Sequence, residues 1–198
     1  MIFATGNKHK LREMRELLPA LDLKGLPDGV ELPPEEGDGY AAIALDKARA
    51  AHEATGEAAI GDDSGIGAEA LGGRPGIHSA RYGGEGASDR ENLDKLLAEV
   101  AEAGGSRRAH YTCALALVGA DGMEAVFEAR CEGRLIEEPR GEGGFGYDPA
   151  FVPDATGAGD DRTMSELSQA EKNEISHRGL AAKMLAEHLG VGEAPASR

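Results

Sequence analysis

The sequence predicts an α/β protein with a mixed sheet. Short apolar segments that fit strands alternate with segments whose apolar residues recur every three or four positions, the periodicity of amphipathic helices. Within residues 108–135, two long strand-like stretches meet at Ala120-Asp121-Gly122, which is a hairpin signal. An antiparallel hairpin inserted into an alternating α/β order predicts a sheet with both parallel and antiparallel neighbours.

The first third of the chain contains two predicted helices among three predicted strands. Residues 1–4 are typical of a buried strand, and the helix that follows has its apolar face on Leu11, Met14, Leu17 and Leu18. Residues 21–26 alternate like a strand, and residues 27–39 form a loop rich in proline, glycine and acidic side chains. A long helix covers about residues 40–54, and residues 58–65 form a short strand that runs into a turn.

The rest of the chain is more irregular. Residues 66–87 are rich in glycine, and Ser88 with Glu91 forms a capping box ahead of a helix. Ser176 caps a last helix that ends at Gly190. The apolar residues of these two helices are Leu93, Leu96, Leu97 and Val100, and Leu180, Met184, Leu185 and Leu189. We expect a single domain over residues 1–198, with a frayed tail at 191–198.

Composition excludes several classes of function. The 198 residues carry 36 acidic and 21 basic side chains, a net charge of −15, which disfavours binding to nucleic acid through its backbone. No apolar run could span a membrane, and the start at Met1 shows no secretory signal. Cys113 and Cys131 lie in neighbouring predicted strands and could touch, but two free thiols in a reducing cytoplasm are favoured.

The segment ATGNKHK, residues 4–10, is a candidate anion-binding turn. A strand ends and a helix begins there, so backbone N–H groups meet the positive end of a helix dipole. Lys8 and Lys10 add charge, and Thr5 and Asn7 add hydrogen-bonding side chains. Taken alone, an ordinary turn capped by Asn7 explains the segment equally well.

The segment GDDSG, residues 61–65, places two carboxylates at the end of a predicted strand. Because side chains alternate along a strand, Asp62 and Asp63 should point to opposite faces. One could bind Mg²⁺ or orient a water while the other secures the turn; a polar turn without function is the alternative. The acidic loop 33–39 offers further oxygen ligands, and Mg²⁺ is typically held by one or two carboxylates together with substrate phosphates.

The segment GEGGFGYDPAFVP, residues 141–153, concentrates aromatic side chains in a glycine-rich loop. Its glycines match the spacing of a dinucleotide-binding turn, but no helix begins there, which excludes that interpretation. Lys172, His177 and Arg178 lie near the start of the predicted last helix, and alone they indicate only an amphipathic segment.

The order of these motifs resembles one family. TGNKHK, an acidic E-x-G loop, DDSG, LGGRPGIHSARYGG, FGYDPAF and EKNEISHRG follow one another as in the inosine/xanthosine triphosphate pyrophosphatases, over about residues 2–189. The resemblance implies an elongated, twisted mixed sheet with flanking helices that form a central cleft. It also implies a homodimer and Mg²⁺-dependent hydrolysis of ITP, dITP and XTP to the monophosphate and pyrophosphate, which cleanses the nucleotide pool.

The resemblance also implies roles for individual residues. Asp63 matches the catalytic carboxylate and a metal ligand, and Glu35 matches the other metal ligand, with Glu36 as its rival. The implied substrate-binding residues are Thr5, Gly6, Asn7, Lys10, Ser64, Phe145, Gly146, Tyr147, Asp148, Lys172, His177 and Arg178. Phe145 is interpreted as a flat platform for the purine, and Phe151 as the core residue that holds it.

One departure from the family pattern is clear. Many bacterial relatives carry Phe-x-Glu-Asn-Ala-x-x-Lys-Ala after the acidic loop, whereas this chain has Ala42 and Ile43 in place of the Glu-Asn pair. Any support that the pair gives to a metal site is absent or reassigned here. The alternative functions are a pyrophosphatase of other modified or ordinary triphosphates, a nucleotide-binding regulator without turnover, and a purely structural domain.

Overall fold

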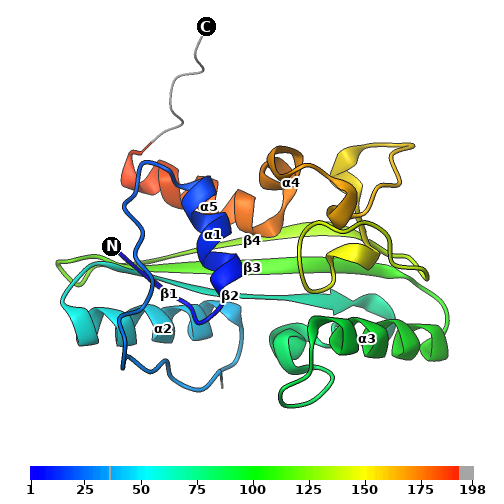
Figure 1. Ribbon diagram of the computed structural model, residues 1–198, viewed down its shortest axis with the longest axis horizontal. Coiled ribbons are helices and arrows are strands. Elements are labelled where there is room, and N and C mark those ends of the chain that lie inside the picture. Colours follow the sequence, from blue (N-terminus) through cyan, green and yellow to red (C-terminus); the bar gives the residue numbers. More distant parts are fainter. Residues whose placement is uncertain (36, 192–198) are drawn as a thin grey trace, which may run out of the picture. The chain divides into compact units, whose positions relative to one another are not determined.

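The computed structural model describes residues 1–35 and 37–191 (Figure 1). A five-stranded sheet has the order β1-β2-β3-β4-β5, in which β1 and β2 are parallel and β4 and β5 antiparallel. The predicted α/β class with a mixed sheet is therefore confirmed. The strands and α-helices are β1 (Ile2–Ala4), α1 (Lys8–Leu17), α2 (Tyr40–Thr55), β2 (Ala59–Ala68), α3 (Asp89–Ala103), β3 (Arg108–Val118), β4 (Glu124–Leu135), β5 (Phe151–Pro153), α4 (Gln169–Ile175) and α5 (His177–Leu189).

The chain forms two compact units, which are described separately. Unit 1 consists of Met1–Asp63, Cys113–Ala129 and Arg178–Arg198, and unit 2 consists of Ser64–Thr112 and Arg130–His177. The divisions fall inside β2, β3 and β4. A single domain over residues 1–198 stays a prediction, and the predicted tail, beyond Val191, lies outside the described residues.

In unit 1, the alternation of side chains along β3 separates two apolar layers. Cys113, Leu115 and Leu117 are buried with Met14 of α1 and Leu185 of α5. The intervening residues Ala114, Ala116 and Val118 are buried with alanines of α2. Helices α1 and α5 thus cover one face of the strands and α2 covers the other (Figure 1).

Unit 2 has its own core. Helix α3 begins with the predicted capping box, in which Ser88 and Glu91 satisfy each other's backbone N–H groups. The core residues of this unit come from α3, the strands, the turn after β2, the loop before β5 and the segment between β5 and α4: Ile66, Ala68, Leu71, Leu93, Leu96, Val100, Ala109, Tyr111, Cys131, Leu135, Tyr147, Ala150, Phe151, Met164 and Leu167. Phe151 is fully buried, which confirms its predicted place in the core.

The prediction of a turn within residues 58–65 is wrong. Strand β2 runs without interruption from Ala59 to Ala68, so Asp62 and Asp63 lie in its middle. The strand also takes in the first residues of the stretch 66–87, which we expected to be irregular: at Gly67 an added Cβ would lie 2.8 Å from the ring of His110. In the sheet β2 lies between β1 and β3, and β1 pairs with it over Ala59–Gly61.

Two further predictions need correction. Residues 21–26 form no strand; Lys24 makes a single bridge to Ile2, and Gly25 and Pro27 follow at once. The last helical segment is two helices, because Ser176 is extended (φ −70°, ψ 152°) between α4 and α5. Ser168 and Glu171 form a second capping box at the start of α4, a signal that the sequence carried. Lys172 therefore lies in α4 rather than in the last helix.

No helix among the described residues is long and apolar enough to cross a membrane. Cys113 and Cys131 are both buried free thiols, as predicted.

The close contact between β2 and α2 gives a stability prediction. An added Cβ at Gly61 would overlap the carbonyl oxygen of Ala44 and lie 2.9 Å from the backbone nitrogen of Ala48. We expect Gly61→Ala to lower the free energy of unfolding by about 1–3 kcal/mol, the usual cost of overpacking. Urea denaturation checks this, with Gly6→Ala as control because a Cβ there meets nothing within 4 Å. Equal stability of the two variants would contradict the packing argument.

Candidate functional site

The predicted anion-binding turn lies between β1 and α1. Asn7 caps α1, and its Oδ1 accepts hydrogen bonds from the backbone N–H groups of His9 at 2.8 Å and Lys10 at 3.3 Å. The Oγ1 of Thr5 accepts from the backbone N–H of Asn7 at 3.1 Å. Gly6 is exposed, and a side chain there would meet nothing within 4 Å. The turn is thus pre-formed by its own side chains, and its glycine leaves room for a ligand.

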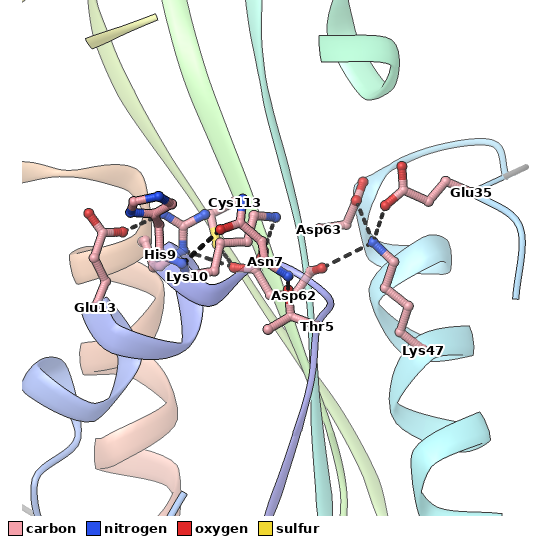
Figure 2. Close-up of polar contacts among 11 residues, drawn as sticks. Thr5, Asn7, His9, Lys10, Glu13, Glu35, Lys47, Asp62, Asp63 and Cys113 are labelled. Atoms are coloured by element: carbon pink, nitrogen blue, oxygen red, sulfur yellow. Dashed lines mark hydrogen bonds and ion pairs between the residues drawn. The ribbon is translucent and has the colours of Figure 1, made fainter. Parts of the chain in front are cut away.

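Asp62 is a buried carboxylate held by cations from two helices (Figure 2). It pairs with the Nζ of Lys10 from α1 and accepts a hydrogen bond from the Nε of Arg178 at 3.0 Å. Although burial alone would raise the pKa of Asp62, the charges of Arg178 and Lys10 hold it well below the usual range. Arg178 also donates from Nη1 to the Oε2 of Glu13 at 2.8 Å. The network joins β2, α1 and α5.

Asp63 points to the opposite face of β2, as predicted (Figure 2). Its Oδ1 accepts from the Nζ of Lys47 in α2 at 3.0 Å, and the same Nζ donates to the Oε1 of Glu35 at 2.5 Å. Burial raises the pKa of Asp63, and Lys47 offsets this only in part. Burial lowers the pKa of Lys47, but Asp63 and Glu35 outweigh it, so the lysine stays charged. Two carboxylates therefore share one ammonium group.

The residues around Asp63 fit a hydrated divalent cation. Its Oδ2 is buried, and none of the described residues offers it a hydrogen bond. The described part of the chain has no group of three or more His, Cys, Asp or Glu residues that could enclose a metal ion. Mg²⁺ does not require such a cage, because one or two carboxylates with phosphate and water oxygens complete its shell. Glu35 and Asp63 could supply those carboxylates, whereas Glu36 lies outside the described residues.

Ala42 and Ile43 stand where the Glu-Asn pair is missing, and they have different environments. Ala42 is exposed, while Ile43 is buried and its Cγ1 would lie 3.0 Å from a Cβ added at Gly37. Gly37 stands two residues after Glu35 in the acidic loop. In this chain the side chain of Ile43 in α2 therefore packs against the acidic loop at Gly37.

In unit 2, the carboxylate of Asp148 is the centre of a polar cluster at the loop before β5. The carboxylate of Asp148 accepts hydrogen bonds from the hydroxyl of Tyr111 at 3.2 Å, the backbone N–H of Phe145 at 3.0 Å and the Nζ of Lys172 at 2.8 Å. The ammonium group of Lys172 also lies 5.1 Å from the centre of the Phe145 ring, within cation–π range. Three of the residues assigned to base recognition are thus in direct contact.

Tyr111, which donates to Asp148, also contacts His177. The rings of Tyr111 and His177 are stacked, with centres 4.5 Å apart and planes 4° apart, and Phe151 meets Tyr111 edge-on at 4.8 Å. Burial raises the pKa of Tyr111 well above its usual value, so its hydroxyl remains a neutral donor to Asp148. Tyr111 therefore orients both the carboxylate and the imidazole.

The aromatic residues of the loop have different environments. Tyr147 is 5% exposed and its hydroxyl donates to the backbone oxygen of Ser79 at 2.6 Å, so its side chain belongs to the core. Phe145 is half-buried and lies outside the core cluster of unit 2. Ser64, which follows Asp63 on β2, is also half-buried. Of the three aromatic side chains, only Phe145 is placed to present a face to a ligand.

Sequence reasoning assigned no site role to Lys47, Glu13 or Tyr111. A signal existed for Lys47, because it is a charged residue on the alanine-rich buried face of a helix and therefore requires an acidic partner. Glu13 and Tyr111 carried no such signal, since each looks like an ordinary residue of its helix or strand. The predicted central cleft stays a prediction.

Comparisons with known proteins point to one family. The model of the Ham1 family matches residues 1–188. A dITP/XTP pyrophosphatase from Sulfurovum sp. is 47% identical over 197 residues, covering 93% of this chain and 90% of the relative. A protein of the same name from Geobacter sulfurreducens is 43% identical over 195 residues, covering 96% of each.

Solved structures show the same relation. A HAM1 protein from Coxiella burnetii has a TM-score of 0.84 at 38% identity, covering 96% of this chain and 98% of that one. The Ham1 protein of Staphylococcus aureus has a TM-score of 0.83 at 34% identity, covering 96% and 97%. With sequence and fold in agreement along nearly its whole length, this chain belongs to the Ham1 family.

Proposed function

We propose that this protein is a nucleoside triphosphate pyrophosphatase that hydrolyses deaminated purine triphosphates, ITP, dITP and XTP, to the monophosphate and pyrophosphate. The observation that carries the reaction type is Asp63, whose buried Oδ2 has no hydrogen-bond partner among the described residues, beside Lys47 and Glu35. The substrate class is supported by membership of the Ham1 family and by the names of the relatives.

The chemistry needs a base next to the α-phosphorus. Water attacks that phosphorus, the bond from it to the oxygen that bridges to the β-phosphorus breaks, and pyrophosphate leaves. Asp63 would accept the proton of the attacking water at Oδ2, while Lys47 holds Oδ1 and keeps the carboxylate oriented. A carboxylate whose pKa is raised by burial is a stronger base than an exposed one.

The triphosphate would bind at the turn before α1. The dipole of α1, the open backbone at Gly6 and the charge of Lys10 favour an anion at this place. Lys10 is held in position by Asp62, and Thr5 and Asn7 hold the turn itself. Preorganised positive charge of this kind stabilises the charge that develops on the departing pyrophosphate.

A divalent cation, Mg²⁺ in our proposal, would be held by Glu35 and Asp63. It supplies positive charge that neutralises phosphate oxygens and polarises the bond to be broken. The protein's own contribution is Lys47, which already gathers the two carboxylates around one positive charge.

The purine would be recognised by its 6-oxo edge. Hypoxanthine and xanthine present a carbonyl at C6 and an N1–H, whereas adenine presents an amino group and a bare N1. Phe145 would stack on the ring, and the donors Lys172 and His177 together with the acceptor Asp148 would match that edge. Arg178 would keep its place in the network of unit 1, where it donates to Asp62 and Glu13. Adenine would leave buried polar groups unpaired, which is costly.

We also propose a cytoplasmic homodimer that has neither nucleic acid nor a membrane as partner.

The substrate assignment has a direct assay. The protein is mixed with Mg²⁺ and ITP, XTP, dITP, ATP or GTP, and pyrophosphate and orthophosphate are measured separately. We expect fast pyrophosphate release from the first three only. ATP lacks the 6-oxo edge, whereas GTP has it, so slow turnover of GTP requires a further penalty against the 2-amino group of guanine. Orthophosphate as the product, or equal turnover of ATP, would reject the proposal in favour of a broader triphosphatase.

The role of Asp63 is tested by Asp63→Asn. The amide keeps the size of the side chain but cannot accept the proton of water, so kcat should fall roughly 10²- to 10⁴-fold. Asp46→Asn is the control, since Asp46 is an exposed residue of α2 with 54% of its side chain accessible. Circular dichroism checks that both variants are folded. Near-normal turnover by Asp63→Asn would remove Asp63 from the mechanism.

The pH dependence follows from the raised pKa of Asp63. The base works only when deprotonated, so activity should be present at neutral pH and lost as pH falls through this pKa. In the metal-free protein burial raises this pKa, so the Asp63 carboxyl should titrate there above the roughly 3.9 of an ordinary aspartate, and a cation held by Asp63 should lower the pKa. NMR titration of the metal-free protein measures this pKa, and a value at or below the ordinary one would contradict the assignment.

A further inference from the structure

We propose that Asp89, the first residue of α3, is a positioning residue that sets the orientation of Phe145. Its Oδ2 accepts a hydrogen bond at 2.8 Å from the backbone N–H of Gly146, 57 residues away in the chain. The inference rests on the proposed function, because it gives Asp89 a part in recognition of the purine through the loop that carries Phe145.

The two peptide groups that border the Cα of Phe145 are each bound to a carboxylate. The N–H of Phe145 donates to Asp148 at 3.0 Å, and the next N–H, that of Gly146, donates to Asp89. The φ and ψ angles of Phe145 lie between these two anchors. The backbone direction at Phe145, from which its ring projects, therefore depends on both, one from the loop itself and one from α3, while Lys172 contacts the ring.

Packing alone does not hold this loop against α3. A cavity of about 310 Å³ lies between them, lined by Asp89, Arg90 and Leu93 of the helix, by residues 141–146 of the loop and by Pro139 and Pro149. Four of those six loop residues are glycines and contribute no side chain that could fill the space. On its other side the loop packs against Ser165, whose backbone oxygen accepts from Gly143 at 3.1 Å, so the hydrogen bond to Asp89 is what links the loop to α3.

Helix α3 is a rigid support for the carboxylate. The capping box of Ser88 and Glu91 secures its first turn, and Leu93 is buried in the core of unit 2. The side chain of Asn92 also accepts from the backbone N–H of Gly83 at 2.6 Å. The backbone of α3 that carries Asp89 is thus held in place, so the carboxylate can position the loop.

Loss of the anchor should weaken substrate binding more than the chemical step. Without Asp89, the ring of Phe145 would sample orientations in which it cannot stack on the purine, whereas Asp63 is untouched. Loss of a hydrogen bond to a charged acceptor should raise KM for ITP roughly threefold to tenfold. The value of kcat should change by less than about twofold.

Three variants test this by steady-state kinetics. Asp89→Ala removes the acceptor and should raise KM, while Asp89→Asn keeps an oxygen at the same place and should restore most of the affinity. Asp94→Ala is the matched control: it removes an acidic side chain from the same helix, where Asp94 pairs with Arg90 at 2.9 Å, and should leave KM unchanged. A fall in kcat alone, no rescue by asparagine, or an equal effect of Asp94→Ala would overturn the proposal.

A second measurement needs no substrate. The chain has no tryptophan, so Phe145→Trp places a single fluorescent reporter in the loop. In that background, Asp89→Ala should raise the acrylamide quenching constant by roughly twofold, because the freed loop exposes the ring, and Asp94→Ala should not. Unchanged quenching would reject the anchor.

The two measurements separate this inference from the proposed function. If the wild-type protein released no pyrophosphate from ITP, the proposed function would fail, and the quenching experiment alone would decide whether Asp89 positions the loop. Thermal unfolding of each variant confirms that the comparison is made between folded proteins.

Discussion

The buried carboxylate of Asp62 is the constraint on which the arrangement of unit 1 depends. It is 1% exposed in the middle of a central strand, and a charge in such a place is tolerated only when it is paired. Lys10 and Arg178 supply the pairing, so the start of α1 and the start of α5 must both lie against β2. Loss of one partner of a buried pair typically costs about 3–5 kcal/mol, which makes this network a condition of the fold as well as of the site.

Unit 2 repeats the same physical solution with different residues. Asp148 is 4% exposed and is satisfied by Lys172, by the hydroxyl of Tyr111 and by a backbone N–H of its own loop. In each unit a buried carboxylate thus holds a lysine that the family resemblance assigns to substrate binding. A lysine fixed in this way loses less conformational freedom when an anionic or carbonyl group binds, and such preorganisation favours both binding and catalysis.

Asp63 differs from these two carboxylates. It has one cation, Lys47, shares that cation with Glu35, and keeps one buried oxygen without a hydrogen-bond partner among the described residues. Structural carboxylates are satisfied by their surroundings, whereas a group that must bind a ligand or a proton is left incomplete. The neighbouring positions 62 and 63 therefore have contrasting environments because β2 presents them to opposite faces. The side chain of Ile43 packs against the acidic loop at Gly37, two residues after Glu35.

The sequence by itself determined the elements that depend on local signals: β1, α1, α2, α3 and the hairpin of β3 and β4. The order of its motifs also indicated the family and the proposed reaction. Only the tertiary structure decided that β2 continues through Asp62 and Asp63, and that Lys47, Glu13 and Tyr111 belong to the polar clusters. The physical reason is distance along the chain, since Arg178 and Glu13 are 165 residues apart. A helix cap is specified by neighbouring residues, whereas the partner of a buried charge is specified only when the chain is folded.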